Sequence, residues 1–486
     1  MKKLSLHILI ILWISSFLSC SVDSVNTQIT KPVSKEPDAI AIPESNTLGT
    51  LLNDPKAYDG YTLFTIHKTT YLIDNCGRVI KQWTSTYDRG GAFSLMEDGS
   101  LLRAGKIVNP ELPYGGIGGI IEKFSWGGEL IWSFRYSNPM YSQHHGLVPL
   151  PNGNILFLSV HKKSKEDAIH TGRNPENLSE DGLYDERIIE IEPSGSNGGN
   201  VVWEWRTWDH LVQDFDNTKD NYGVVSENPQ LLDINYLGSS NGDSDWLHFN
   251  SIQYHVDLDQ IIISSQKLSE IYIIDHSTTT EEAKFDDGGN SDMGGDFIFR
   301  WGNPEAYHHG TPADRKLFGQ HNAYWIPNEY PDGSKIMLFN NGLGRKTDYS
   351  SIDIISTPKE GIYNYVYNLG QPYGPQAAEW TYIDPEEPTK FYSKILSSAQ
   401  RLPNGNTLIC EGTQGKFFEI DEDLTIVWKY INPVTNHGQR LSQGDSAASN
   451  IFQAIKYSPD YIGLNDKDLT PGNPLELNFD IGTCEQ

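Results

Sequence analysis

The sequence predicts an all-β protein, a six-bladed β-propeller that is closed by N-terminal strands pairing with the C-terminal blade. Three observations predict this fold: strand–turn–strand units that recur along the chain, incomplete units at its two ends, and a composition rich in turn residues. The chain has 486 residues, of which 44 are glycine and 26 are proline. Such a mixture is typical of a globular protein with many short strands and turns.

The clearest repeat is the pentapeptide Leu-Pro-Asn-Gly-Asn followed by an apolar strand, at residues 150–154 and 402–406. Its Asn-Gly pair supplies the positive φ angles of a tight hairpin, so each copy is strand, turn and strand. An earlier unit has Asp98-Gly99 in the same turn. Each unit continues into a second pair of strands that ends near a tryptophan. With looser copies, the repeats cover residues 92–134, 143–205, 248–302, 321–370 and 397–430, which indicates the blades of a propeller.

The two ends of the chain each carry an incomplete unit. Residues 62–67, 70–74 and 78–83 predict three strands that lack an inner partner, whereas residues 451–457 predict an inner strand without outer partners. Joining the ends completes a sixth blade and leaves no exposed sheet edge.

This closure brings Cys76, between two N-terminal strands, close to Cys484 near the C-terminus. We therefore predict a Cys76–Cys484 disulfide, which the oxidising compartment of an exported protein would allow. Because a sequence does not determine cysteine connectivity, two unpaired thiols are the alternative. Cys410 lies in an apolar run, which predicts a buried free thiol.

The N-terminus has the pattern of a targeting segment. Lys2 and Lys3 precede an apolar run over residues 4–18, which is short for a membrane span, and Cys20 directly follows Ser19. The pattern resembles a bacterial lipobox, so we expect cleavage before Cys20, lipidation of its thiol, and anchoring to a bacterial membrane, the outer membrane facing the periplasm or the cell surface. An ordinary secretory signal is the alternative. The chain then divides into a signal peptide (1–19), a flexible tether (20–60) and the propeller domain (61–486).

The charge of the chain excludes some classes of partner. Lys and Arg number 37 against 64 Asp and Glu, a formal net charge of -27. Nucleic acid and anionic membrane surfaces are therefore not expected partners, and contact with a membrane is expected only through the N-terminal lipid. An anionic substrate would need a local cluster of hydrogen-bond donors.

Histidines recur where the inner strands begin. In a propeller these strand starts converge on the central channel, although they lie far apart in the sequence. Three successive blades place histidine there, at His144-His145, His248 and His321. Neutral imidazoles can exchange protons near pH 7, attack an electrophile or bind a metal. A single histidine at such a position is usually structural, but convergence of several predicts a functional site.

Polar residues follow these histidines. Asn250 and Asn322 lie one or two residues after His248 and His321, and Lys267 follows the next strand of its blade. The segment 339–345 contains Asn341 and ends at Arg345, whose planar guanidinium suits an anionic oxygen. We predict substrate binding by the five residues His144, Asn250, Asn322, Asn341 and Lys267, while a solvated surface turn is the alternative for the arginine.

Several segments together resemble the bacterial arylsulfotransferases. They include DWLHFNS, GQHNAYW, FNNGLGR and QRLPNGNTLICEG, and the resemblance extends from about residue 61 to residue 464. It implies a periplasmic six-bladed propeller that moves a sulfuryl group from an aryl sulfate to a phenol without a nucleotide donor, a cofactor or a metal. It also implies that a histidine attacks sulfur. Carried over by motif, His248, His321 and Arg345 are catalytic candidates, and His145 joins them from the matching blade.

One departure from the family pattern leaves the mechanism open. The family's sulfated histidine comes from a late blade, where this chain has Ser397-Ser398, and His437 is the sole histidine after His321. Either the nucleophile has moved, or the branch performs other chemistry, or the propeller only binds a sulfated or phenolic ligand. A metal-assisted hydrolase is a further alternative, although the chain contains no HxH or HExxH motif.

Overall fold

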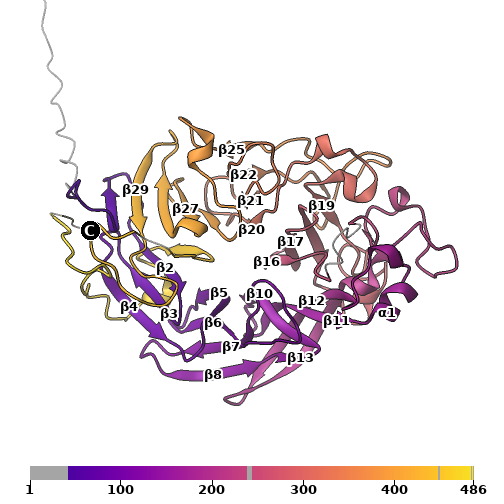
Figure 1. The fold of residues 1–486 in the computed structure, drawn as a ribbon, viewed down its shortest axis with the longest axis horizontal. Helices are drawn as coiled ribbons and strands as arrows, with labels where there is room; N and C mark the ends of the chain where they lie inside the picture. The colour runs from indigo at the N-terminus through magenta and orange to yellow at the C-terminus, as the bar shows by residue number, and fades with distance from the viewer. Residues whose placement is uncertain (1–41, 238–243, 447–448, 483, 485–486) are drawn as a thin grey trace, which may run out of the picture. The chain divides into compact units, whose positions relative to one another are not determined.

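The computed structural model describes residues 42–486 apart from 238–243, 447–448, 483 and 485–486. The predicted signal peptide and Cys20 lie outside the described residues. Six small antiparallel sheets form a ring, and the chain visits them in sequence order (Figure 1). None of the helices in the described part has the length and apolar character needed to cross a membrane.

Each of four blades is built from a single stretch of the chain, whose four main strands follow one another from the inner to the outer edge of the sheet. Blade 1 contains β5 (Arg89–Leu95), β6 (Leu101–Lys106), β7 (Gly119–Phe124) and β8 (Leu130–Arg135). Blade 2 contains β10 (Tyr141–Pro149), β11 (Ile155–Lys163), β12 (Leu183–Ser194) and β13 (Gly198–Arg206), with β9 (Ser137–Asn138) beside β10. Blade 3 contains β16 (Phe249–His255), β17 (Gln260–Ser265), β18 (Glu270–Asp275) and β19 (Phe299–Trp301). Blade 4 contains β20 (His321–Trp325), β21 (Ile336–Asn340), β22 (Ser351–Ile355) and β25 (Trp380–Tyr382).

The other two blades combine strands from both ends of the chain. Blade 5 contains β26 (Ser398–Arg401), β27 (Thr407–Glu411), β28 (Lys416–Ile420), β29 (Ile426–Ile431) and, outermost, β1 (Gly49–Asn53). Blade 6 contains β30 (Ala454–Tyr457), β2 (Tyr61–Ile66), β3 (Thr69–Ile73) and β4 (Val79–Thr84). Because β30 pairs antiparallel with β2, with Tyr61 opposite Tyr457, the predicted closure of a six-bladed propeller is confirmed.

The N-terminal segment closes the ring a second time. Strand β1 pairs with β29, with Gly49 opposite Ile431 and Asn53 opposite Trp428. The folded body therefore begins within residues 20–60, which the sequence predicted as a tether. The five residues of β1 form an edge strand without a hairpin partner in the neighbouring sequence, so no local pattern marked them.

The remaining elements belong to connections between strands. The α-helix α1 (Lys165–His170) follows β11, and the two-stranded pairs are β14 (Leu211–Val212) with β15 (Leu232–Asp233) and β23 (Lys359–Glu360) with β24 (Asn364–Tyr365). The connections after β11 and β13 pack on each other, because Arg173 donates to the carbonyl of Leu237 at 2.7 Å.

Tryptophans on the outer part of five blades hydrogen-bond to the following blade. The indole N–H of Trp83 in blade 6 donates to a carbonyl of blade 1, and that of Trp428 in blade 5 donates to a carbonyl of blade 6. The indoles of Trp132, Trp205 and Trp301 make the same kind of bond to the following blade. These rings are buried between blades, where their N–H needs a partner. The tryptophan near the end of four of the five predicted repeats is thus an inter-blade contact, whereas the repeat at 321–370 does not end near a tryptophan.

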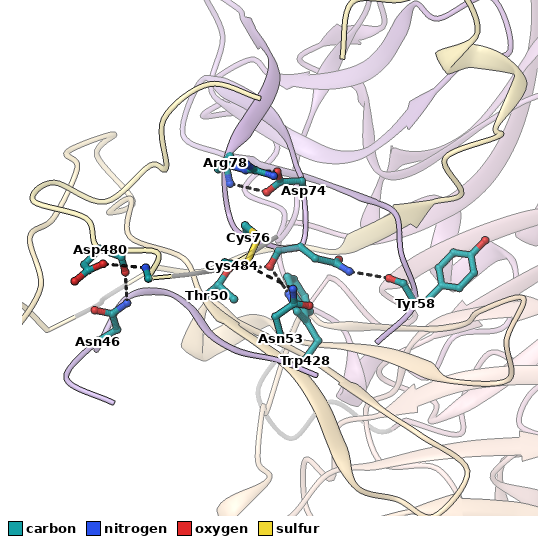
Figure 2. The surroundings of a disulfide bond; sticks show 12 residues. Asn46, Thr50, Asn53, Tyr58, Asp74, Cys76, Arg78, Trp428, Asp480 and Cys484 are labelled. Carbon is teal, nitrogen blue, oxygen red and sulfur yellow. Dashed lines mark hydrogen bonds and ion pairs between the residues drawn. A yellow bond between two sulfur atoms is a disulfide. The ribbon is translucent and has the colours of Figure 1, made fainter. Parts of the chain in front are cut away.

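A disulfide joins the two chain ends, and Figure 2 shows its surroundings. Cys76 in the β3–β4 connection bonds to Cys484, 408 residues later, with the Cα atoms 5.9 Å apart. Beside it, the hydroxyl of Thr50 and the indole of Trp428 both donate to the carbonyl of Asn75. The predicted Cys76–Cys484 pairing is confirmed. Cys410 is a buried free thiol.

A charged histidine connects blades 2 and 3. His276, which follows β18, binds Asp259 through Nδ1 at 2.7 Å and Glu190 of β12 through Nε2 at 2.9 Å. Burial alone would lower its pKa, but the two carboxylates outweigh that effect and raise the pKa to about 9. Since the imidazole of an unfolded chain titrates near 6.5, this interaction stabilises the fold fully below that pH and is lost as pH rises through about 9.

We expect His276→Gln to lower the free energy of unfolding near neutral pH by up to about 3 kcal/mol and to have little effect above pH ~9.5. Urea unfolding at the two pH values measures the difference. The matched control is His437→Gln, because His437 lies on an exposed turn. A pH-independent loss in His276→Gln would contradict the charged interaction.

Candidate active site

The inner strands of all six blades enclose one axial cavity of about 340 Å³. Its walls are mainly apolar, with Phe93, Leu147, Ile252 and Phe452 among them, and His321 contributes an imidazole. This volume is at the lower end of the range for ligand pockets, roughly 300–1,000 Å³. The cavity therefore suits a small aromatic ligand.

The inner strands begin with a repeated backbone distortion. A register shift interrupts their pairing close to the first residues of β10, β16 and β20, and left-handed backbone occurs there at His145 (φ 42°), His248 (φ 51°) and Asn322 (φ 54°). Such conformations are costly for residues other than glycine, and they persist where surrounding structure requires them. The distortion places the predicted histidines at one end of the axial channel.

His321 is held in one tautomer by Asn341. The amide nitrogen of Asn341 donates to the carbonyls of Ser393 and Leu396 at 2.7 and 2.9 Å, so its oxygen faces the ring of His321. Nδ1 of His321 lies 2.8 Å from that oxygen and must carry the proton. The lone pair of Nε2 then accepts a hydrogen bond from the Leu396 N–H at 3.3 Å, and Nε2 must release this bond before it can attack an electrophile.

Burial lowers the pKa of His321 to about 4. The hydrogen bond that His321 donates to Asn341 raises this pKa, while the charge of His248 lowers it further. The imidazole is therefore neutral at physiological pH. A neutral ring with its lone pair at Nε2, on the wall of an apolar cavity, is a competent nucleophile.

His248 differs from His321 in its charge. Its Nδ1 lies 2.5 Å from a carboxylate oxygen of Asp245. Burial lowers the pKa of His248, but the charge and hydrogen bond of Asp245 outweigh burial, so the pKa is raised above its usual value. The positive charge of Lys267 acts in the opposite direction. His248 can therefore hold a proton near neutral pH and act as a general acid.

His145 is the last member of a buried chain of hydrogen bonds that begins at Glu186 and passes through His144. Glu186 of β12 accepts from Nε2 of His144 at 2.8 Å, and Nδ1 of His144 lies 2.9 Å from Nδ1 of His145. His144 donates its ring proton from Nε2 to the carboxylate of Glu186. Its Nδ1 therefore accepts the hydrogen bond that Nδ1 of His145 donates. Burial, with the charges of the neighbouring histidines, lowers the pKa of His145 well below its usual range. The rings of His145 and His248 are 4.9 Å apart.

The sequence profile of the arylsulfotransferase family (ASST) matches residues 50–453, which is most of the chain. The chain belongs to the arylsulfotransferase family. The family acts on aryl sulfates and phenols, and membership of it implies a transferase. No curated protein matches this arylsulfotransferase closely enough to count as a relative.

Several solved structures have a similar course of the chain. One is a protein of unknown function from Bacteroides caccae, with 9% identity over 82% of this chain and 98% of that chain, and a TM-score of 0.42. A streptogramin B lyase has 13% identity over 86% and 96%, with a TM-score of 0.38. A catalytically inactive virginiamycin B lyase from Staphylococcus aureus, solved with quinupristin, has 12% identity over 79% and 88%, with a TM-score of 0.37. Scores this low say nothing of function.

Two of the predicted substrate-binding asparagines of this arylsulfotransferase line the cavity. Asn250 donates from its amide to the carbonyl of Gln320 at 2.7 Å, and its side-chain oxygen has no hydrogen-bond partner among the described residues. The oxygen of Asn322 instead accepts from the Ala399 N–H at 3.0 Å and joins blades 4 and 5. The Asn250 oxygen is therefore a buried acceptor without a partner among the described residues, whereas that of Asn322 is used within the protein.

The predicted cationic residues lie outside the cavity wall. Arg345 donates to the carbonyl of Tyr349 at 2.9 Å and the hydroxyl of Ser351 at 3.0 Å, and its guanidinium stacks on the Tyr349 ring. These contacts of Arg345 stabilise the turn after β21. Lys267 is half-buried and acts electrostatically on His248.

The structure also locates Ser397 and Ser398, which begin the late blade, and His437, the histidine of the loop before the last inner strand. Ser397 donates from its hydroxyl to Ser393 at 2.8 Å and receives the Gly412 N–H at 3.0 Å. Ser398 is buried at the start of β26, and His437 is exposed on a turn. Within the described ranges, no group of three or more His, Cys, Asp or Glu side chains could hold a metal ion.

Sequence reasoning missed three residues of this site: Tyr114, Glu186 and Asp245. Asp245 stands three residues before His248, and that spacing was a usable signal. Glu186 had none, because its partner His144 is 42 residues away on another strand. Tyr114 lies in a connection between strands, outside the repeat.

Proposed function

We propose that this arylsulfotransferase transfers a sulfuryl group from an aryl sulfate to a phenol in the axial cavity, by way of a covalent intermediate on His321. The observation that carries the proposal is a neutral, tautomer-fixed imidazole on the wall of an apolar cavity, near a histidine whose pKa is raised.

In the first half-reaction, the lone pair of His321 Nε2 attacks sulfur. The bond from sulfur to the aryl oxygen breaks, and its electron pair leaves with that oxygen. Protonated His248 donates a proton to the departing phenolate, so the first product is a neutral phenol. Asn341 keeps its oxygen on the Nδ1–H of the sulfated ring, where positive charge develops.

The second half-reaction reverses these roles. An acceptor phenol enters the cavity, its oxygen attacks sulfur, and its proton passes to His248. The bond from sulfur to nitrogen breaks, and the electron pair returns to His321. Donor and acceptor use the same cavity in turn, as ping-pong kinetics require.

The test is an assay of purified protein with a chromogenic aryl sulfate and phenol. We expect chromogen release that depends on the phenol concentration, together with phenyl sulfate identified by mass spectrometry. Absence of phenyl sulfate at any phenol concentration would refute transfer.

The alternative is binding without turnover. The observation that favours it is the late blade, where the hydroxyl of Ser397 is engaged within the protein and the sequence has serine in place of histidine. Calorimetry that shows aryl sulfate binding, from a preparation without chromogen release, would favour this second function.

A change of charge beside His248 gives a pH test of the proposal. Asp245→Asn removes the carboxylate that raises the pKa of His248, so the alkaline limb of the rate profile should move to lower pH. We expect a rate loss on the order of tenfold in mildly alkaline buffer. Initial rates of chromogen release across neutral and alkaline pH measure it.

The matched variant is Lys267→Gln, which removes a charge that lowers the same pKa. Its alkaline limb should move to higher pH. Equal or unshifted profiles in the two variants would show that His248 is not the acid.

We further propose that the protein is exported and anchored by a lipid on Cys20, in the outer membrane facing the periplasm or the cell surface. The apolar run over residues 4–18 and the cysteine that follows Ser19 support this location. Incorporation of labelled palmitate that requires Cys20 would test it.

A further inference from the structure

The axial cavity follows the inner strands well beyond the residues at which they begin. Each of the six blades contributes a run of consecutive residues to its wall, at 92–94, 146–149, 250–253, 321–324, 397–401 and 452–455. Pro327 and Tyr330, which come after the end of β20, line it as well. Because His321 is the first residue of β20, the cavity extends from the proposed nucleophile past the end of its strand.

We propose that the acceptor of this arylsulfotransferase is a phenol that carries a second aromatic ring, joined end to end with the first, and that the wall around Tyr330 binds this second ring. The observation that carries the inference is the extent of the cavity beyond His321. The inference names the substrate class of the site already described, and it rests on the proposed function.

The cavity is longer than a phenol with one ring. At about 3.3 Å per residue, the advance from His321 to Pro327 covers at most ~20 Å. A one-ring phenol whose oxygen reaches sulfur on His321 occupies roughly the first half of this length. The remaining part, which we call the distal half, is lined by Val148, Pro149, Tyr324, Pro327, Tyr330 and Ile455.

The distal half presents mainly apolar surface to a ligand, because its polar groups are used between blades. Gln253 accepts a backbone N–H of blade 4 at 2.7 Å, and Gln400 bonds a backbone N–H and a carbonyl of blade 6 at 2.7 and 2.9 Å. The hydroxyl of Tyr324 accepts the Arg401 N–H at 2.7 Å. What is left consists of aliphatic groups, prolines and tyrosine rings, against which an aromatic ring packs well.

The charges of the wall favour an uncharged ring. None of the described residues on the wall is acidic, although the chain has 64 Asp and Glu. The guanidinium of Arg401 is neutralised by Asp332 at 2.8 Å. An ammonium or a carboxylate in the distal half would lose its water without gaining a counterion. A second aromatic ring loses no such hydration.

Solvent reaches the cavity from its distal end. His321 and Ser397 are buried where the strands begin, whereas Val148, Pro149 and Tyr330 are half-buried at the other end. A two-ring phenol can therefore enter with its hydroxyl first and leave its second ring among the distal residues. That ring displaces water from apolar surface, which strengthens binding.

The experiment compares phenol with para-phenylphenol as acceptors of the sulfuryl group from the same chromogenic aryl sulfate. The two hydroxyls have similar acidity, so a difference in rate reports the second ring. We expect kcat/KM for para-phenylphenol to exceed that for phenol by at least about tenfold. Equal values, with phenyl sulfate formed from phenol, would overturn the inference and leave the proposed function standing.

Two variants locate the second ring. Tyr330→Ala removes an aromatic wall of the distal half, and Val148→Phe fills part of it. Each should reduce the preference for para-phenylphenol to less than about threefold. Turnover of phenol should change little and reports correct folding, because His321 and the first half of the cavity are intact. A full preference retained in both variants would overturn the inference. Tyr222→Ala is the control, since that tyrosine is half exposed on the surface.

Failure of the proposed function gives a different result. If the wild type sulfates neither acceptor, transfer is refuted, and calorimetry then tests the cavity alone. In that case para-phenylphenol should still bind at least about tenfold more tightly than phenol. Equal affinities would overturn the inference as well.

Discussion

Replacing His321 with alanine should lower the rate of chromogen release by at least about 10³-fold, the scale seen when a catalytic nucleophile is removed. The variant keeps the cavity and the His145–His248 pair, so binding of the aryl sulfate should change far less than turnover. The reason is that Nε2 of this ring carries the unprotonated lone pair on the cavity wall, which is held in the resting protein only by the Leu396 N–H at 3.3 Å. Steady-state kinetics with a chromogenic aryl sulfate measure the loss.

A covalent test separates the nucleophile from a bystander. The wild type is incubated with aryl sulfate in the absence of phenol, and the reaction is then quenched. One sulfuryl group should remain on the peptide that contains His321, and the alanine variant should carry none. His437→Ala is the matched control, since that imidazole is exposed on a turn. If His145→Ala lost the sulfuryl group and His321→Ala retained it, the nucleophile would be assigned wrongly.

The order of the blades and the convergence of the histidines could be predicted because both follow from the repeat. The Asn-Gly turns locate each inner hairpin, and residues at equivalent strand starts meet around the axis even when they are far apart in the sequence. The 4.9 Å separation of the His145 and His248 rings is a consequence of that symmetry. Circular closure followed from the same periodicity, since the half-blades at the two ends were complementary.

Of the groups around these histidines, the spacing of Asp245 from His248 was a usable signal, but Glu186 and Tyr114 could not be predicted. Glu186 lies on the third strand of its blade, and nothing in its neighbourhood distinguishes it from the other acidic residues of a chain with a net charge of -27. The contact of Tyr114 with His248 depends on how one irregular connection folds back over the channel. Arg345 shows the opposite case: its motif suggested an anion clamp, whereas its donors bind the turn after β21.

Loss of the disulfide should have the largest effect on stability. We expect Cys76→Ser to lower the free energy of unfolding by about 6 kcal/mol, because the bond closes a loop of 408 residues and restricts the unfolded chain. The chain-entropy model predicts the greatest effect for such long loops. Urea unfolding of the oxidised wild type and of the variant measures the difference.

So large an effect follows from the way in which the ring closes. Two strand pairs, β2 with β30 and β1 with β29, join the N-terminal segment to the C-terminal blades, and Cys76 and Cys484 lie beside the second of them. Without the covalent bond, both pairs must form from distant parts of the chain, which costs loop-closure entropy. Cys484→Ser should therefore lose the same amount as Cys76→Ser, and reduction of the wild type should match both. A wild type that is equally stable when oxidised and reduced would show that strand pairing alone closes the propeller.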